Sequence, residues 1–353
     1  MKTREKVSVQ ELSSSPADEQ TSKPEPLVFQ SAGRRVYRAR ALKVLIMGAG
    51  AVGGYFGARL AAAGTDVTFV ARGSHLTAIR KEGLRVESPL GDIHVRPAKV
   101  IDDPVSVGIV DAVLFAVKLW DTEEAALRIK PIVKPGTAVI SLQNGVQKDD
   151  VLRSVLGREA VVGGVGYLSS TITQPGVIRH EGKLQKIILG EYDGKHSARC
   201  LALLKAFTRA GIDVELSDDV ERAIWEKIIF IIGLSATTSA IRLPIGPIRS
   251  HPQARALLLE VMHEAVTVGR AGGVRLDPGF AETQLALCDS VSPNMTSSMY
   301  VDLERGNRLE LRWLSGAVVE LGQKWGVSTP SNRVLYDTLV IHSEGKRALN
   351  EST

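Results

Sequence analysis

Residues 43–57 read Lys-Val-Leu-Ile-Met-Gly-Ala-Gly-Ala-Val-Gly-Gly-Tyr-Phe-Gly, and this stretch constrains the fold more than any other. An apolar run of strand length, residues 44–47, leads directly into Gly48, Gly50 and Gly53 in the GxGxxG pattern. Gly48 permits a tight turn from strand to helix, Gly50 lets the backbone approach a pyrophosphate, and Gly53 lets helix and strand pack closely. The pattern therefore predicts the first turn of a Rossmann fold.

The phosphates of a dinucleotide would lie on the N–H groups and the positive dipole end of the helix that follows this loop. The alternative is a glycine-rich turn in some other α/β protein. The residues predicted to bind the cofactor here are Gly48, Ala49, Gly50, Ala51, Val52 and Gly53.

The end of the second predicted strand, residues 66–71, indicates which dinucleotide binds. An NAD site places Asp or Glu about 20 residues beyond the first glycine. Here Ala71, Arg72, Gly73 and Ser74 occupy that region, so no carboxylate is available for a ribose 2′-hydroxyl. The guanidinium of Arg72 can pair with a 2′-phosphate, which favours NADP(H). The alternative is a solvated arginine at a strand end.

Composition indicates a two-domain enzyme without a metal or a disulfide framework. The chain has 353 residues, and 44% of them are hydrophobic. We expect no apolar run of the ~18 residues that a membrane-spanning helix needs, and therefore a soluble, cytoplasmic protein. Cys200 and Cys288 are the two cysteines and lack metal-ligand spacing, and the histidines are scattered.

Residues 1–40 account for most of the net positive charge, with eight lysines and arginines against five acidic residues. Their low apolar content predicts a disordered tail, and a short second tail is expected at 346–353. The remaining chain is nearly neutral, which does not indicate a nucleic-acid partner. The sequence leaves the oligomeric state open, with a homodimer as one alternative.

Strand and helix patterns alternate after the glycine motif, as in a doubly wound sheet. Residues 111–117 and 137–142 read as buried strands, and 161–165 and 186–189 as shorter ones. Ligands of open α/β sheets bind at the carboxyl ends of strands, so Lys118 and Asn144 are expected to face the nicotinamide half of the cofactor. Each has an equally weighted alternative, an exposed strand-end lysine or a turn asparagine.

The pattern becomes helical beyond about residue 217. We therefore predict a Rossmann domain at 41–216 and an all-α domain at 217–345, with the catalytic site between them. The predicted helices cover 219–241, 250–272, 278–289, 296–303, 308–325 and 331–343.

Lys227 lies in an otherwise apolar stretch of the first of these helices, with Glu226 beside it. A lysine in a desolvated stretch loses part of its preference for the charged form, which suits proton donation. The alternative is a lysine that extends to the helix rim and pairs with Glu226.

Ordered blocks in both domains carry a resemblance to a known family. They are residues 48–54, Lys118, Gln143-Asn144-Gly145, Trp225-Glu226-Lys227, residues 297–302, and Glu304-Arg305-Gly306 leading to Glu310. In these blocks the chain resembles the ketopantoate reductases (2-dehydropantoate 2-reductases) over about 42–345.

The resemblance implies a role for each matching residue. Lys227 corresponds to the lysine that protonates the ketone oxygen while NADPH delivers hydride to the carbonyl carbon. Glu310 matches the acid near the nicotinamide ribose and the substrate hydroxyl, Ser298 a contact to the substrate carboxylate, and Asn144 a cofactor contact. By pattern alone, Glu310 could equally form a surface pair in a helix with Arg308 and Arg312.

The chain departs from the family on the substrate side. Asparagines are usual one and two turns after the catalytic lysine, and here Ile231 and Ser235 stand in those positions. Met295 replaces another usual asparagine, with Asn294 beside it. Three alternatives stay open: an NADPH-dependent reductase that forms (R)-pantoate for coenzyme A biosynthesis, a reductase of a more apolar 2-oxo acid, and a non-catalytic NADPH-binding regulator.

Overall fold

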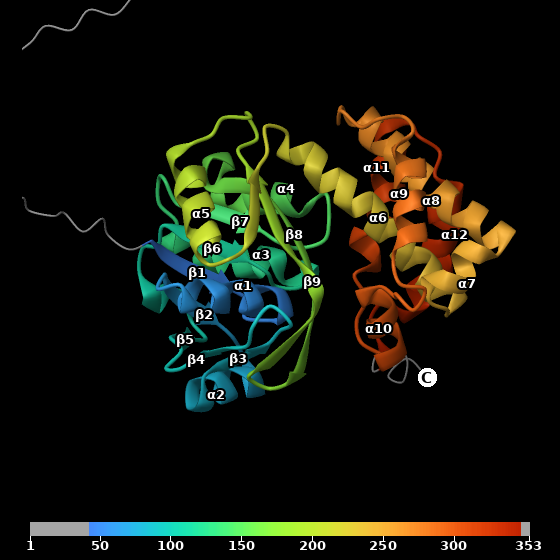
Figure 1. Ribbon diagram of the computed structural model, residues 1–353. Coiled ribbons are helices and arrows are strands. Elements are labelled where there is room, and N and C mark those ends of the chain that lie inside the picture. The colour runs from blue at the N-terminus through green and yellow to red at the C-terminus, as the bar shows by residue number, and fades with distance from the viewer. Residues whose placement is uncertain (1–41, 347–353) are drawn as a thin grey trace, which may run out of the picture. The chain divides into compact units, whose positions relative to one another are not determined.

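The computed structural model describes residues 42–346 of the chain (Figure 1). Both predicted tails, 1–40 and 346–353, lie outside the described residues except for Lys346. The described residues belong to one compact unit. The division at residue 217 stays a prediction.

Six parallel strands form the Rossmann sheet in the spatial order β5-β2-β1-β6-β7-β8. In chain order this is 3-2-1-4-5-6, the arrangement in which a dinucleotide binds where the order reverses, between β1 and β6. The predicted α/β class with a Rossmann domain and a helical second part is confirmed. The strands are β1 (Lys43–Met47), β2 (Asp66–Val70), β5 (Val100–Ile101), β6 (Ala112–Phe115), β7 (Ala138–Ser141) and β8 (Val161–Gln174).

Helices cover both faces of this sheet, because alternate side chains of each strand point to opposite faces. Val44 and Ile46 of β1 belong to one buried cluster, and Leu45 and Met47 belong to another. The first cluster packs against α1 (Ala51–Ala62), α2 (Gly73–Glu82) and α5 (Ala198–Arg209), and the second against α3 (Thr122–Ile129) and α4 (Lys148–Leu156).

The predicted short strands at 161–165 and 186–189 are wrong in extent. They belong to one long antiparallel hairpin of β8 and β9 (Val177–Gly190). The outer half of the hairpin is largely exposed and polar, so its apolar pattern is weak. The other edge of β9 pairs with β3 (Leu84–Glu87) and β10 (Asp213–Leu216), and β3 also pairs with β4 (Ile93–Val95).

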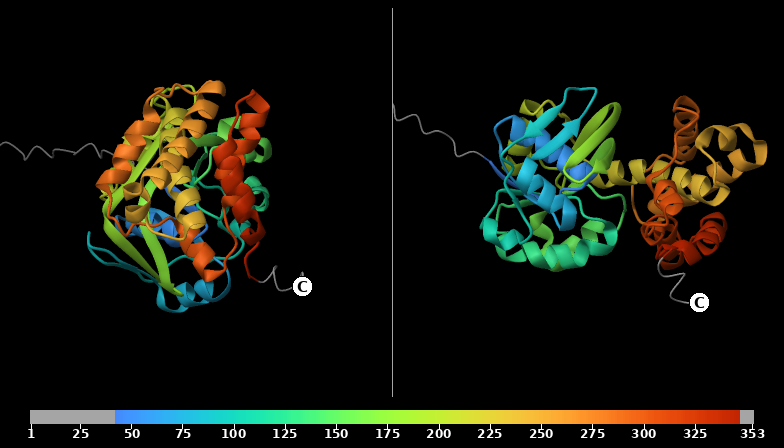
Figure 2. Two further views of the ribbon diagram at one scale, coloured as in Figure 1. Left: turned by 90° about the vertical axis from the view of Figure 1, so that its right-hand side faces the viewer. Right: turned by 90° about the horizontal axis from the view of Figure 1, so that it is seen from below.

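The helical part begins with α6 (Val220–Ile241), which runs from the sheet into the other helices (Figures 1 and 2). By length and composition α6 could cross a membrane, so the expectation of no such run is wrong. However, 67% of its most apolar window is buried inside the protein, where it packs as a core helix. Gly233, for example, leaves the space that the side chain of Met262 occupies.

Among residues 42–346, six further helices surround α6, and two predicted boundaries are wrong. The predicted helix 250–272 is divided at His251, and the predicted helix 308–325 begins only at Ser315, because Leu314 has a non-helical backbone (φ −106°, ψ −101°). The helices are α7 (Ile245–Ser250), α8 (Pro252–Ala271), α9 (Phe280–Ser290), α10 (Ser298–Arg305), α11 (Ser315–Trp325) and α12 (Pro330–Leu339).

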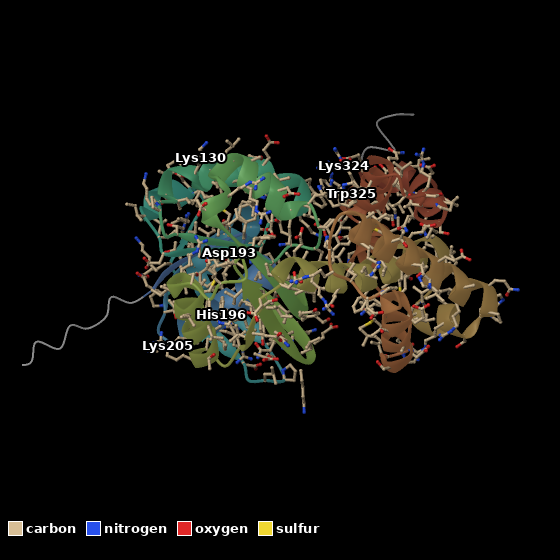
Figure 3. The ribbon with its side chains drawn as sticks, turned by 90° about the horizontal axis from the view of Figure 1, so that it is seen from above. Lys130, Asp193, His196, Lys205, Lys324 and Trp325 are labelled. Carbon is tan, nitrogen blue, oxygen red and sulfur yellow. The ribbon has the colours of Figure 1, made fainter. Side chains whose placement is uncertain are left out.

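The end of α11 shows how closely these helices pack. The ring of Trp325, labelled with Lys324 in Figure 3, lies against Gly272, where a Cβ atom would be only 2.4 Å from the ring. Any larger residue at position 272 would displace the indole ring from the end of α8.

Candidate active site

The glycine loop joins β1 to α1 at the point where the strand order reverses. Gly48 has φ +100°, and a Cβ atom there would be 2.9 Å from the backbone of Ala116 and Val117, which follow β6. A Cβ atom on Gly53 would lie 2.2 Å from the Gly48 carbonyl oxygen. These two glycines are therefore required by the backbone itself.

Gly50 has a different environment, since a Cβ atom at this position would meet nothing within 4 Å. Gly50 caps the N-terminus of α1, so the open space lies at the positive end of the helix dipole. This space fits the close approach of a pyrophosphate, which would contact the backbone of residues 48–53.

Arg72 is the N-cap of α2, and its side chain is 81% exposed. Its Nη2 atom donates a hydrogen bond of 2.6 Å to Oδ2 of Asp121, which lies in the 3-10 turn Leu119–Asp121 after β6. Nothing in the spacing of Arg72 and Asp121 along the chain predicts this contact. The geometry places Arg72 at the carboxyl edge of the sheet, with most of its guanidinium open to solvent.

Lys118 connects the Rossmann part to the helical part. Its Nζ atom donates to Oδ2 of Asp302 on α10 at 3.0 Å and lies 3.9 Å from Oε2 of Glu310. Burial works against the charged form of Lys118, but the carboxylates of Glu310 and Asp302 outweigh it and raise the pKa of Lys118.

Glu310 lies in an irregular segment and not in the predicted helix 308–325, so the alternative of a surface pair along a helix is wrong. Arg308 pairs with Glu344 instead. Oε1 of Glu310 accepts a hydrogen bond of 3.1 Å from the backbone N–H of Leu119. Burial raises the pKa of Glu310, against the effect of Lys118 and of that N–H, which favour the charged form.

Lys227 extends from α6 toward the end of the sheet. Its Nζ atom donates to Oδ1 of Asn144 at 2.7 Å and to the carbonyl oxygen of Gly166 on β8 at 2.5 Å. Glu226 pairs with Arg222 at 2.7 Å. The alternative of a rim lysine paired with Glu226 does not describe this arrangement.

The pKa of Lys227 is lowered to about 7, first by burial and then by the positive charge of Lys148, while Glu310 works in the opposite direction. Part of the side chain still reaches solvent. An amine of this kind exchanges a proton near neutral pH, as a general acid or base requires.

The substrate-side residues are spread along α6 and α10. Ile231 is partly buried one turn beyond Lys227, whereas Ser235 is 1% exposed and its hydroxyl has no hydrogen-bond partner among residues 42–346. Ser298 is the exposed first residue of α10, and its neighbour Ser297 contacts Thr238 at 3.2 Å. Thr238 is about 16 Å along the helix axis from Lys227. The role of Ser298 in binding the substrate stays a prediction.

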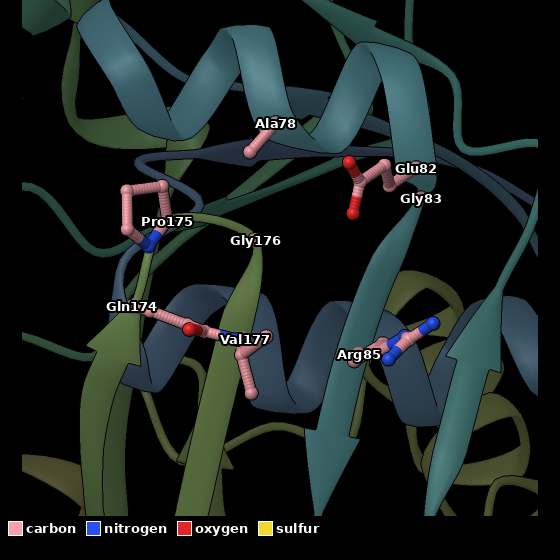
Figure 4. Close-up of a pocket in the computed structure, with 8 residues that line it drawn as sticks. All are labelled: Ala78, Glu82, Gly83, Arg85, Gln174, Pro175, Gly176 and Val177. Atoms are coloured by element: carbon pink, nitrogen blue, oxygen red, sulfur yellow. The ribbon is translucent and has the colours of Figure 1, made fainter.

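Two other features contribute nothing to this site. A cavity of about 40 Å³ lies between the end of α2 and the turn of the β8–β9 hairpin (Figure 4), and none of its lining residues is a predicted site residue. Within the described part of the chain, no group of three or more His, Cys, Asp or Glu side chains is placed to hold a metal ion. The absence of a metal in the reaction stays a prediction.

Comparison with known proteins identifies the family. Residues 44–194 match the family described as Ketopantoate reductase PanE/ApbA, and residues 219–342 match its C-terminal counterpart. A 2-dehydropantoate 2-reductase of Halobacterium salinarum is 33% identical over 297 residues, which cover 84% of this chain and 97% of that protein. The Uncharacterized oxidoreductase YkpB of Bacillus subtilis is 30% identical over 305 residues, 86% of this chain and 100% of the relative.

A solved structure supports the same conclusion. The PanE/ApbA family ketopantoate reductase from Ralstonia eutropha has a TM-score of 0.79 at 37% sequence identity, covering 86% of this chain and 98% of that one. Both halves of the chain thus match the same family, and the prediction of an oxidoreductase is confirmed. The protein belongs to the ketopantoate reductase family.

Proposed function

We propose that the protein reduces the ketone of 2-dehydropantoate to (R)-pantoate with NADPH, and that Lys227 donates the proton. The observation that carries this proposal is the amine of Lys227, whose pKa of about 7 and whose two hydrogen bonds make it an oriented acid near neutral pH. Relatives named 2-dehydropantoate 2-reductase, at 33% identity for one of them, support the choice of substrate.

The chain's own residues would hold the cofactor at two places. The backbone of residues 48–53 fits the pyrophosphate. The exposed guanidinium of Arg72 would pair with a 2′-phosphate, either while it keeps its ion pair with Asp121 or after that ion pair breaks. NADPH, when bound, supplies the hydride. Lys118 follows β6, and Glu310 accepts a hydrogen bond from the next backbone N–H, at the carboxyl edge of the sheet where the nicotinamide half is expected.

Lys227 would act on the oxygen of the substrate ketone. As hydride reaches the carbonyl carbon, negative charge develops on that oxygen, and a positioned ammonium group both stabilises the charge and transfers its proton. Asn144 accepts a hydrogen bond from the amine and so limits the directions in which its remaining protons point. Ser298, at the start of α10, would contact the substrate carboxylate.

In this proposal the reaction takes place in the cytoplasm and supplies pantoate for pantothenate and coenzyme A biosynthesis. A homodimer is the assembly to be tested. The direct experiment follows NADPH oxidation with the purified protein and a panel of 2-oxo acids. Highest kcat/KM with 2-dehydropantoate supports the proposal, and no reduction of any 2-oxo acid would refute it.

A second candidate, reduction of a more apolar 2-oxo acid, is favoured by specific side chains. Ile231 and Met295 are partly buried where the family usually has asparagine. Trp120 and Trp313 also lie beside Lys118 and Glu310, with their rings 6.2 Å apart and the Lys118 Nζ atom 5.5 Å from Trp120. These aromatic residues were not recognised as site residues from the sequence.

The double substitution Ile231→Asn/Ser235→Asn tests the second candidate. It should raise kcat/KM for 2-dehydropantoate by about tenfold, because one added hydrogen bond to a substrate hydroxyl contributes ~1 kcal/mol or more. The single variant Ile231→Asn and a melting curve control for overpacking at the buried position 235. If the unmodified enzyme already prefers 2-dehydropantoate over all bulkier apolar 2-oxo acids, the second candidate is wrong.

A further inference from the structure

The mechanism above leaves one buried charged group unused. Lys148 is the first residue of α4 and only 3% exposed. Its Nζ atom donates to both carboxylate oxygens of Asp149, at 3.1 and 3.0 Å, and to the carbonyl oxygens of Ser141 at 3.0 Å and Gly164 at 3.1 Å. A buried ion pair rarely adds net stability over an apolar pair of similar volume. The Lys148–Asp149 pair is therefore a candidate for a functional role.

Lys148 replaces a missing strand contact at the end of the sheet. β8 pairs with β7 only at Val161 and Val162. Beyond Val162, the edge of β8 that faces away from β9 has no strand partner within residues 42–346. The ammonium group of Lys148 bridges this gap, because it binds Ser141 at the end of β7 and Gly164 on β8.

Lys227 binds the same edge two residues further along, at the carbonyl oxygen of Gly166. Carbonyls two residues apart in an extended strand point to the same side, and they are separated by about 6.6 Å. Two ammonium groups thus occupy neighbouring positions on one strand edge. Lys148 binds the same stretch of backbone that accepts the hydrogen bond from Lys227.

The charged and titratable groups around Lys227 determine the direction in which its pKa is shifted. Lys148 disfavours the charged form of Lys227, and Glu310 favours it. The ring of Tyr167 lies 5.6 Å from the amine, and burial raises the pKa of this tyrosine to about 12, so it is neutral. Asn144 carries no charge, and Glu226 on the same helix is paired with Arg222.

Asp149 is held on the far side of Lys148 by a second contact. The hydroxyl of Tyr192 donates a hydrogen bond of 2.6 Å to its Oδ2 atom. The carboxylate is therefore fixed against Lys148 and Tyr192, whereas the amine of Lys227 binds Asn144 and Gly166.

We propose that Lys148 is a positioning residue for Lys227: held by Asp149, it orders the Gly164–Gly166 edge of β8 and keeps a second positive charge beside the reactive amine. This inference rests on the proposed function, because Lys148 would affect turnover only through Lys227, the proposed proton donor. It extends the catalytic machinery to a buried pair that never touches the substrate.

The experiment measures the titration of Lys227 without turnover. The full-length protein is labelled competitively with acetic anhydride across a pH series, and the extent of labelling at Lys227 is read by peptide mass spectrometry. Lys148→Met should move the midpoint for Lys227 upward by roughly one unit, because a like charge is lost and Asp149 is left unneutralised. Burial lowers the pKa of Lys148 and Asp149 opposes this effect, so in Asp149→Asn the buried Lys148 should become neutral and the midpoint for Lys227 should rise as well.

Lys130→Met, at an exposed lysine labelled in Figure 3, is the matched control and should leave the midpoint unchanged. If Lys148→Met does not fold because Asp149 is stranded, the double variant Lys148→Met/Asp149→Asn removes both charges, and its midpoint should also rise. A raised midpoint in Lys148→Met, or in the double variant, supports the proposal. A midpoint that is lowered, or that equals that of Lys130→Met, overturns it.

The labelling result separates this inference from the proposed function. Retained activity in Lys227→Ala would refute the role of Lys227 as proton donor, but the midpoints measured at Lys227 in the Lys148 variants would still test the role of Lys148. Conversely, an inactive Lys227→Ala together with unshifted midpoints in the Lys148 variants would support the reaction and reject the role of Lys148.

Discussion

Lys227→Ala is expected to lower kcat for 2-oxo acid reduction by about 10²- to 10⁴-fold, the usual contribution of a positioned general acid. The substitution removes the amine that Asn144 and the Gly166 carbonyl oxygen hold in place. The dissociation constant for NADPH, measured by fluorescence titration, should change little, because the proposed phosphate contacts are at residues 48–53 and Arg72. Steady-state kinetics on the best substrate give the comparison.

Two further variants sharpen this prediction. Lys227→Arg should restore little activity, because a guanidinium holds its proton too tightly to act as an acid at neutral pH. Lys205→Ala, at an exposed position on α5, is the matched control and should retain parental kcat. A Lys227→Ala enzyme within a few-fold of the parent would mean that the mechanism is wrong.

Arg72→Asp should reverse or abolish the preference for NADPH over NADH. The guanidinium is replaced by a carboxylate that repels a 2′-phosphate, and Asp121, which lay 2.6 Å from Arg72, adds a second negative charge nearby. Loss of a charge-assisted contact costs ~1.5–3 kcal/mol, so kcat/KM for NADPH should fall about 10- to 100-fold, and that for NADH much less.

The control for this experiment is Lys130→Asp, which makes the same charge reversal on an exposed residue of the Rossmann part. Both cofactors are compared at a fixed ionic strength, because screening weakens exposed charge interactions. Equal kcat/KM values for NADPH and NADH in the unmodified enzyme would show that Arg72 does not select the cofactor.

The sequence predicted the Rossmann fold because its strongest signals are local. Gly48 and Gly53 are required by backbone contacts within a few ångströms, and the strands at 44–47 and 112–115 are buried on both faces, so they read as continuous apolar runs. The outer hairpin was missed because exposed, polar segments carry little periodicity, and α7 was missed because it is short and contains Gly246 and Pro247.

The candidate site was predictable only in part. Lys227 stands out because a charge in an apolar helix is conspicuous, and Glu310 was found through the resemblance while its local structure was mispredicted. Asp121, Trp313 and the pair Lys148–Asp149 gave no signal, because their roles arise from contacts between residues far apart in the chain. Spacing along the sequence does not report such contacts.

The pH dependence of kcat/KM, measured in both directions, tests the central claim most directly. Reduction needs protonated Lys227 and oxidation of the 2-hydroxy acid needs the neutral amine, while the pKa of Lys227 in the free protein is about 7. The reduction rate should therefore fall as the pH rises through this region, and the oxidation rate should rise through the same region. Profiles that are flat there, or that change in the same direction for both reactions, would contradict proton donation by Lys227.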